Sequence, residues 1–274
     1  MDLFSSLYPF SFCSLASGSN GNCYYIGNGD EGILVDAGIS LRSIKKRLSE
    51  VGIPMKQIKA ILISHAHIDH IKGLSALANT FALPVYASFQ TCEGIFRNWS
   101  ASGIRRDLLH TIEDGEKVQL AGLLVETFAV SHDAAGALGY HIRNNHNSIT
   151  IATDLGFICD KVSHYLSKAS MLVIESNYDD EMLTNGRYPK HLQQRIRGEK
   201  GHLSNIQAAD YLTQHYHSGM KQIFLCHLSQ QNNTPELALK TLNQYFLDKQ
   251  ISKSPETVIR ALPRGARTEL IHVI

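Results

Sequence analysis

The segment that most constrains this chain is an apolar run that stops abruptly at a cluster of histidines. Ile61-Leu62-Ile63-Ser64 is followed by His65-Ala66-His67-Ile68-Asp69-His70, so three histidines and an aspartate fall within six positions. The apolar run predicts a buried strand, and apolar residues at three- and four-residue spacing predict a helix over Ile71–Phe81. On the loop between a strand and a helix, these side chains can converge on one point.

Imidazole nitrogens and carboxylate oxygens suit zinc and neighbouring divalent metals. Four such groups on one loop exceed what a single open catalytic metal needs, which suggests two metals in a shared site. The alternative is a polar loop with solvated histidines, which fits a lone histidine better than this pattern directly after a strand.

The rest of the chain alternates predicted strands and helices. Strands are predicted at Ser11–Ala16, Cys23–Gly27, Gly32–Asp36, Ala60–Ser64, Leu123–Val130, Leu138–Arg143, Ser148–Thr153, Met171–Glu175, Gln222–Cys226, Thr257–Leu262 and Thr268–Ile274. Hairpin turns are predicted at Asn20–Gly21 and Asn144–Asn145. Besides Ile71–Phe81, helices are predicted from a cap at Ser40 to Glu50, over Asn205–Tyr216 and over Pro235–Phe246. No linker or short repeat interrupts the pattern, so we expect one layered domain over residues 1–274 with mixed sheets and outer helices.

Composition excludes several classes of protein. Of 274 residues, 43% are apolar and 19% charged, which is enough to build a full core, and the net charge of +1 rules out a protein-wide field for polyanions. Five cysteines without CxxC spacing disfavour a disulfide scaffold or a zinc ribbon. The start, MDLFSSLYPF, lacks the pattern of a signal peptide, and no apolar stretch approaches the ~20 residues of a membrane span. We therefore expect a cytoplasmic protein without a membrane association, and no obligate protein partner is evident.

The H-x-H-x-D-H loop resembles the hallmark of the metallo-β-lactamase superfamily, and other motifs of that superfamily follow in order. They are matched by Asp36 after Ile33-Leu34-Val35, His132 after Val130-Ser131, Asp154 after Ile151-Ala152-Thr153, and His227 after Phe224-Leu225-Cys226. The resemblance implies an αββα sandwich of two mixed sheets with outer helices. It also implies that His65, His67 and His132 hold one metal, that Asp69, His70 and His227 hold the other, and that Asp154 bridges them. Asp36 would orient a ligand without binding metal.

Each of these matches also has a plainer interpretation. Asp36 and Asp154 can be turn residues before glycines, and His132 and His227 can be histidines at a sheet rim. Their joint placement at strand ends, where open layered folds bind ligands, favours function.

Two further segments bear on the bond that is hydrolysed. Lys200-Gly201-His202-Leu203-Ser204-Asn205 resembles a segment of the phosphodiesterase branch of the superfamily, in which the histidine lies beside the scissile phosphate. Glu175 in Val173-Ile174-Glu175-Ser176-Asn177 resembles the glutamate that supports this histidine. His202 would then assist the leaving group. Alternatively, His202 simply precedes a helix that Ser204 caps.

The stretch Arg187–Lys200 is basic, with Arg187, Lys190, Arg195, Arg197 and Lys200 against Glu199. It can contact substrate phosphates or form a solvated helix face. The loop Ser17–Asn22 can line the site or be only a hairpin turn.

Within the superfamily the chain is most similar to the bacterial YycJ/VicX/WalJ-type group, through Leu15–Asn22, Ser131–Ala135, Thr153–Gly156, Glu175–Asn177 and His227–Asn233. That group is regarded as single-domain, and exonuclease activity on DNA is attributed to it. Tyr178 departs from the group, which often has histidine there, so substrate placement can differ. A β-CASP insertion is disfavoured, because Asp154 and His227 are only 227 − 154 = 73 positions apart.

The resulting hypothesis is a hydrolase of phosphodiester bonds with two divalent metals, acting on nucleic acid. Zn²⁺ is expected from the nitrogen-rich ligands, with Mn²⁺ or Fe²⁺ as alternatives. Asp69, His202 and Glu175 are the expected catalytic residues. The rivals are hydrolysis of a thioester, a lactone or a small phosphodiester, and a non-catalytic regulatory protein that retains the fold.

Overall fold

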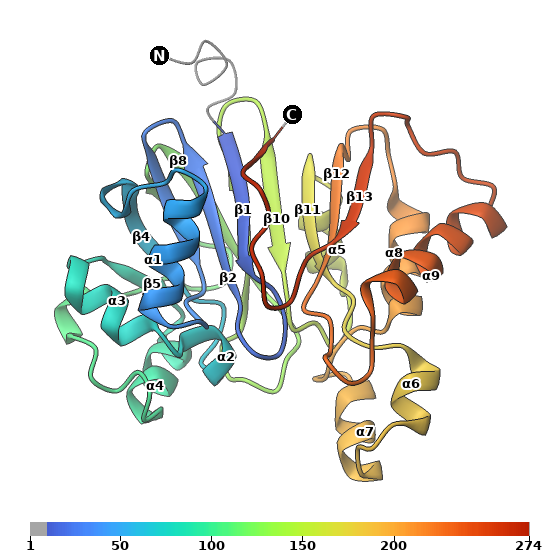
Figure 1. Ribbon diagram of the computed structural model, residues 1–274, viewed down its shortest axis with the longest axis horizontal. Coiled ribbons are helices and arrows are strands. Elements are labelled where there is room, and N and C mark those ends of the chain that lie inside the picture. Colours follow the sequence, from blue (N-terminus) through green and yellow to red (C-terminus); the bar gives the residue numbers. More distant parts are fainter. Residues whose placement is uncertain (1–9, 274) are drawn as a thin grey trace.

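The structure is a computed structural model, which describes residues 10–273. Figure 1 shows two sheets face to face, with helices on the outer face of each. The predicted αββα sandwich is therefore confirmed. The predictions on the first nine residues and on Ile274 lie outside the described residues.

The N-terminal sheet has seven strands in the order β14-β1-β2-β3-β4-β5-β6. The strands are β1 (Phe10–Ala16), β2 (Cys23–Asn28), β3 (Glu31–Val35), β4 (Ile58–Leu62), β5 (Val85–Ala87), β6 (Leu109–Thr111) and β14 (Ile271–His272). β1, β2 and β3 pair antiparallel, whereas β3 to β6 pair parallel. The helices between these strands are α1 (Leu41–Glu50), α2 (Ile68–Ile71), α3 (Leu74–Phe81) and α4 (Phe89–Arg97), with single 3₁₀ turns at Met55–Gln57 and Arg106–Leu108.

The C-terminal sheet also has seven strands, in the order β13-β12-β11-β10-β9-β8-β7. The strands are β7 (Lys117–Leu120), β8 (Leu123–Ala129), β9 (Leu138–Arg143), β10 (Ser148–Ala152), β11 (Met171–Glu175), β12 (Gln222–Cys226) and β13 (Val258–Ala261). β10 to β13 are parallel to one another. The helices are α5 (Asp160–Leu166), α6 (Asp180–Asn185), α7 (Lys190–Arg197), α8 (Asn205–His215) and α9 (Pro235–Asp248).

Alternation along the strands builds three apolar layers. In β2, Tyr24 and Ile26 belong to the cluster between the sheets, whereas Cys23 and Tyr25 face α1 and α3. In β11, Val173 points between the sheets, and the neighbouring residues pack with α8 and α9. Because successive side chains point to opposite faces, strands buried on both faces read as continuous apolar runs, and this is why these strands were predictable.

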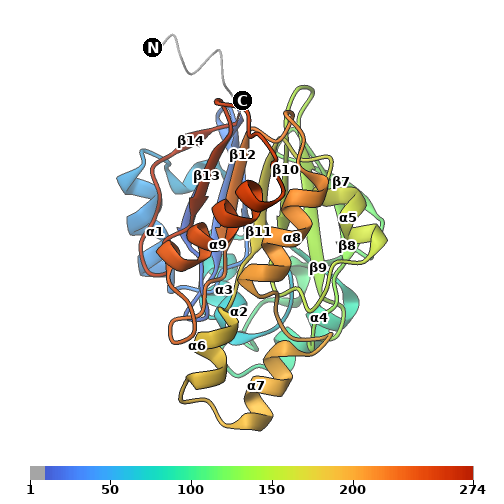
Figure 2. The ribbon, with the colours of Figure 1, turned by 90° about the vertical axis from the view of Figure 1, so that its right-hand side faces the viewer.

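The parallel strands of both sheets end at one edge of the sandwich. In Figures 1 and 2 this edge is the lower one, where α2 follows β4 and where α6 and α7 extend beyond the C-terminal sheet. Such an edge is where open α/β sheets bind ligands. The fold therefore brings segments that are distant in sequence to one place.

Several short elements were missed by the sequence prediction. β5 and β6 span three residues each and β7 is largely exposed, so none has a clear apolar pattern. α4, α5 and α6 were also not predicted. The predicted last strand, Thr268–Ile274, was too long: Thr268 bonds Ser14 through its N–H and its hydroxyl, but the ladder to β1 covers only Ile271 and His272. Both hairpin turns are present, between β1 and β2 and between β9 and β10.

Among residues 10–273, no helix combines the length and the apolar character needed to cross a bilayer.

Candidate metal centre

Three histidines form a first cluster of possible metal ligands. His65 and His67 follow β4, and His132 follows β8. One ligand nitrogen from each lies within 4.8 Å of the others. Nδ1 of His67 is 3.2 Å from Nε2 of His132, and the Nδ1 of His132 faces the carbonyl of Gly201 at 3.3 Å. The rings thus point their free nitrogens at a common point.

A second cluster joins Asp69, His70 and His227, whose ligand atoms also lie within 4.8 Å of one another. Asp69 Oδ2 is 3.5 Å from His70 Nε2 and 3.4 Å from His227 Nε2. His70 Nδ1 donates to Asp36 Oδ2 at 2.7 Å, which leaves its Nε2 for the cluster. Asp36 is itself held by the N–H and hydroxyl of Ser64. Asp36 therefore contacts a candidate ligand and not the centre itself.

Asp154 lies between the two clusters. Its Oδ1 is 3.7 Å from His132 Nε2 in the first cluster, and its Oδ2 is 3.2 Å from His70 Nε2 in the second. Asp154 Oδ2 and His65 Nε2 are both buried without a hydrogen-bond partner among the described residues. An unsatisfied buried polar atom costs about 1–3 kcal/mol. A bound cation would satisfy both atoms, so the donor set fits divalent metal.

The backbone at three of these strand ends is strained. Asp36, Asp154 and His227 have φ of 62°, 56° and 53°, in the left-handed region that residues other than glycine rarely adopt. They follow β3, β10 and β12. Such conformations persist where the surrounding structure imposes them and concentrate at functional sites.

The close packing of this edge also requires a small residue at Gly38. A Cβ atom on Gly38 would lie 1.6 Å from the carbonyl oxygen of Asp69. Asn22 bridges the same region, because its N–H donates to the Asp69 carbonyl and its Nδ2 lies 3.0 Å from His70 Nε2. The loop Ser17–Asn22 thus packs against the second cluster, and its role goes beyond that of a hairpin turn.

Glu175, at the end of β11, is fully buried and organises two histidines. Its Oε1 accepts from His202 Nδ1 at 2.9 Å and from His227 Nδ1 at 2.8 Å. Its Oε2 accepts from the N–H groups of Leu155 and Leu203. His202 Nδ1 also lies 3.6 Å from Asp154 Oδ1. The predicted contact between Glu175 and His202 is present, and the second contact, to His227, was missed by the sequence prediction.

Electrostatics at the centre is dominated by buried carboxylates. Burial alone would lower the pKa of His227, but the charge of Asp154 and the hydrogen bonds that His227 donates to Asp69 and Glu175 raise it to about 10. Burial alone would also lower the pKa of His70, but the carboxylates of Asp36, Asp69 and Asp154 outweigh burial and raise it. For His202, too, burial is outweighed by Glu175, and the pKa is raised. The carboxylates therefore favour positive charge at this place.

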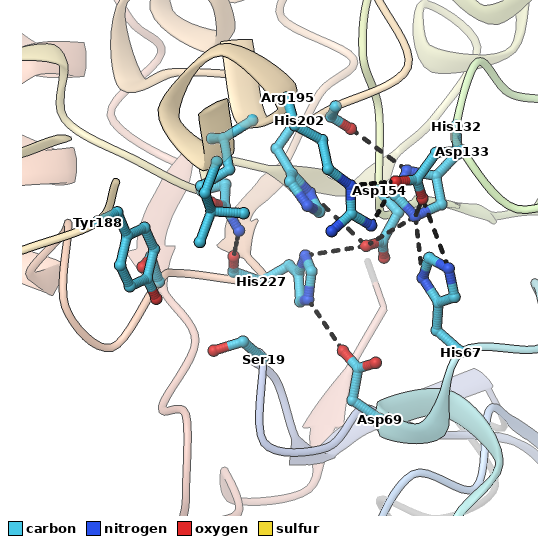
Figure 3. Close-up of a pocket in the computed structure, with 15 residues that line it drawn as sticks. Ser19, His67, Asp69, His132, Asp133, Asp154, Tyr188, Arg195, His202 and His227 are labelled. Carbon is cyan, nitrogen blue, oxygen red and sulfur yellow. Dashed lines mark hydrogen bonds and ion pairs between the residues drawn. The ribbon is translucent and has the colours of Figure 1, made fainter. Parts of the chain in front are cut away.

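A cavity of about 240 Å³ opens onto the two clusters (Figure 3). Candidate ligands and His202 line one part of it. The rest of its wall comes from other segments, with lining residues Ser19, Asp133, Asn177, Tyr188, Leu192, Arg195, Ile196, Gly201 and Ser229. Ser19, Asp133, Asn177, Arg195, Gly201 and Ser229 belong to segments that the sequence had already indicated. Tyr188, Leu192 and Ile196 were not singled out, and their four-residue spacing is the signal that could have indicated them.

The basic stretch before His202 is divided between the cavity and the surface. Arg195 reaches the cavity and pairs with Asp133 through Nε at 2.7 Å, while Arg197 pairs with Asp180 and Thr184. Tyr178, the departure from the similar group, is 3% exposed and is not among the residues that line the cavity. Its backbone carbonyl accepts from Asn205 at 2.8 Å, so it packs at the start of α8.

A two-sheet sandwich with histidine and aspartate clusters at one edge defines the class of metal-dependent hydrolases with the metallo-β-lactamase fold. The chain belongs to the β-lactamase superfamily, because the profile described as "Beta-lactamase superfamily domain" matches residues 32–227. The resemblance predicted from the motifs is thereby confirmed.

Two curated relatives are similar along most of their length. "Exodeoxyribonuclease YycJ" of Bacillus anthracis is 36% identical over 243 residues, which are 87% of this chain and 89% of the relative. "Exodeoxyribonuclease WalJ" of Streptococcus pneumoniae is 34% identical over 85% of this chain and 87% of the relative. Among solved structures, the metallo-β-lactamase fold protein YhfI of Bacillus subtilis superposes with a TM-score of 0.68 at 17% identity and covers 95% of this chain and 100% of that chain. The protein is accordingly an enzyme of the metal-dependent hydrolase family.

Proposed function

We propose that this enzyme hydrolyses phosphodiester bonds of nucleic acid with two bound divalent ions and that it acts on DNA as an exonuclease. The observation that carries the proposal is the placement of His202 at the edge of the metal centre. Glu175 Oε1 holds its Nδ1 at 2.9 Å, and the side chain lines the cavity beside Asp154. The two relatives named exodeoxyribonucleases, similar along most of their length, support the choice of substrate.

Each ligand cluster would hold one ion. His65, His67 and His132 would bind the first, and Asp69, His70 and His227 would bind the second. Asp154 would bridge them, since its two carboxylate oxygens face different clusters. The nitrogen-rich set favours Zn²⁺, and Mn²⁺ or Fe²⁺ would also suit it.

When bound, the two ions would lower the pKa of a water molecule and neutralise charge on the phosphoryl oxygens. The protein side chains supply the rest. Asp69, which lines the cavity, would help to hold the attacking water. His202, oriented by Glu175, would protonate or stabilise the leaving oxygen through Nε2, since Nδ1 is engaged. General acid assistance of this kind is typically worth about 10²–10⁴-fold in rate.

Asp36 and Glu175 would act through the residues that they hold. Asp36 fixes the ring of His70, and Glu175 fixes the rings of His202 and His227. Partners of this kind set the tautomer and the orientation of a ligand.

The bond that is hydrolysed can be tested by comparing two small substrates on the purified, metal-loaded enzyme. We expect turnover of bis-(p-nitrophenyl) phosphate and no turnover of a glutathione thioester. Hydrolysis of the thioester alone would contradict the proposal and would favour the thioesterase alternative. An Asp69→Ala variant controls for contaminating activity and should turn over neither substrate.

A further inference from the structure

The cavity wall opposite the metal-ligand loop is an apolar stripe on and just before α7. Tyr188, Leu192 and Ile196 recur at four-residue spacing, and all three line the cavity. Each is half-buried, and α7 contains no fully buried residue. An apolar stripe at this spacing normally packs into a core. Here the stripe faces the cavity, so its apolar surface can contact a ligand bound there.

The helix that carries this stripe is fixed to the metal centre at its C-terminal end. Ser131 Oγ donates to the carbonyl of Glu199 at 2.6 Å, and the His202 N–H donates to the carbonyl of Ile196 at 2.9 Å. A Cβ atom on Gly156 would lie 1.9 Å from the Glu199 carbonyl oxygen, so this approach is close. The stripe therefore has a defined position relative to His202 and Asp154.

The cavity thus has two chemically different ends. Figure 3 shows Tyr188 at one end and His67 at the other, with His202 and His227 between them. One end offers histidines and carboxylates, the other offers the aromatic ring of Tyr188, and Leu192 and Ile196 line the cavity wall along α7. Arg195 adds a cation to the wall between α7 and Asp133.

A nucleotide has the same division, with a charged phosphate at one end and a flat, largely apolar base at the other. Bases stack on aromatic side chains with little dependence on sequence, because every base has a π-face. The cavity of about 240 Å³ lies below the roughly 300–1,000 Å³ of pockets that enclose whole drug-sized ligands. Its size suits one nucleotide of a strand and not several.

We infer that Tyr188, Leu192 and Ile196 bind the base of the terminal nucleotide while its phosphodiester lies at the metal centre. This inference rests on the proposed function and deepens it, because it names the residues that contact the base. Tyr188 supplies the stacking surface, and Leu192 and Ile196 exclude water from the edge of the base. The site therefore binds a terminal nucleotide that carries any base more tightly than one without a base. It also requires that the terminal base of the DNA strand is unpaired.

The test compares two single-stranded DNA oligonucleotides that differ only in the nucleotide at the cleaved end. One carries a normal nucleotide there, and the other carries a base-free tetrahydrofuran residue. For the wild-type enzyme we expect kcat/KM to be about 5- to 150-fold higher on the normal end, the range that corresponds to stacking of one base. Tyr188→Ala should remove most of this preference by lowering kcat/KM on the normal end, because the base-free end has no base for the ring to contact.

Three further variants sharpen the result. Tyr188→Phe keeps the ring and should keep the preference. Leu192→Ala should reduce the preference partly. Leu247→Ala removes an exposed leucine on α9 that does not line the cavity, and it should behave as wild type. Melting temperature and bound metal, measured for every variant, show whether each has folded.

The outcomes separate the inference from the proposed function. Suppose that the wild type cleaves the normal oligonucleotide, and that Tyr188→Ala either slows cleavage of both substrates equally or slows neither. The assignment of the base site is then wrong, whereas the nuclease function stands. If the wild-type enzyme cleaves no phosphodiester with any metal, the proposed function fails and the inference fails with it.

Discussion

Glu175 Oε1 accepts a hydrogen bond from His202 Nδ1 at 2.9 Å, and this contact joins β11 to the segment that precedes α8. The same oxygen also binds His227 Nδ1, so one buried carboxylate links a candidate catalytic histidine to a candidate metal ligand. Replacing His202 and replacing Glu175 should therefore have different effects on turnover and on metal binding.

His202→Ala should slow hydrolysis of DNA by about 10²–10⁴-fold, because the leaving oxygen loses its proton donor. Bound metal should stay at the wild-type amount, since the proposed ligand sets do not include His202. The measurement is kcat on a labelled oligonucleotide together with metal content by mass spectrometry. His146→Ala, in the exposed turn between β9 and β10, is the matched control and should retain full activity. Wild-type turnover by His202→Ala would remove the catalytic role.

Glu175→Gln should weaken metal binding as well as turnover. Residues that hold a ligand in place typically contribute about 10–100-fold in metal affinity, and Glu175 holds His227 at 2.8 Å. Competition with a chromogenic chelator would measure this affinity. The double variant Glu175→Gln/His202→Ala should lose less activity than the product of the two single losses, because both changes disrupt one unit. Unchanged metal affinity in Glu175→Gln would contradict the link to His227.

The left-handed backbone conformation at the strand ends predicts that a glycine variant is more stable there than an alanine variant. In the presence of chelator, His227→Gly should be more stable than His227→Ala by about 1 kcal/mol, because glycine adopts φ near 53° without strain. His132, which is not among the positive-φ residues, provides the control. There the glycine variant should be equal to or less stable than the alanine variant. Urea unfolding monitored by circular dichroism gives all four free energies, and an alanine variant at 227 that is more stable than glycine would refute the strain.

His141, outside the metal centre, predicts a pH dependence of stability. Its pKa is lowered from 6.5 to about 4, mainly by burial; Glu126 opposes this shift, and the electrostatic effects of Lys168, Arg143 and His164 add to it. Since the unfolded chain binds a proton below pH 6.5 and the folded chain does not until about pH 4, stability falls as the pH drops through this window.

The loss attributable to His141 is up to about 3 kcal/mol, from the size of the shift in pKa. His141→Gln cannot titrate, and its amide can still donate to Thr150 Oγ1, which accepts from His141 Nδ1 at 2.8 Å in the wild type. The difference in unfolding free energy between wild type and this variant should therefore change between pH 6.5 and pH 4. Urea titrations at fixed pH, both with chelator, measure it; a constant difference would show that His141 titrates normally.

Much of the candidate metal centre could be indicated from the sequence, because its residues directly follow apolar strands. His65, Asp154 and His227 each end a continuous apolar run, and the parallel strands of both sheets end at one edge. Recognition of the H-x-H-x-D-H loop fixed the family, and the order of the later motifs did the rest.

What the sequence could not provide depends on contacts between distant segments. The contact from Glu175 to His227 joins residues 52 positions apart, and the positive φ values follow from packing at the strand ends. α7 was predicted only as a basic stretch, because its many charged residues dominate the sequence pattern there. The apolar spacing of Tyr188, Leu192 and Ile196 was therefore not recognised. The orientation of α7 toward the cavity arises from its attachment to Ser131 and Gly156.

We propose that the two ligand clusters hold the metal ions of a nuclease. The most direct measurement is release of labelled nucleotides from DNA and RNA, single- and double-stranded, by the wild type and by Asp69→Ala. Zn²⁺, Mn²⁺ and chelator are run in parallel. We predict mononucleotide release from DNA ends that requires metal and is lost in Asp69→Ala. No release with any metal, from a wild-type protein that binds two metal ions per chain, would contradict the nuclease function.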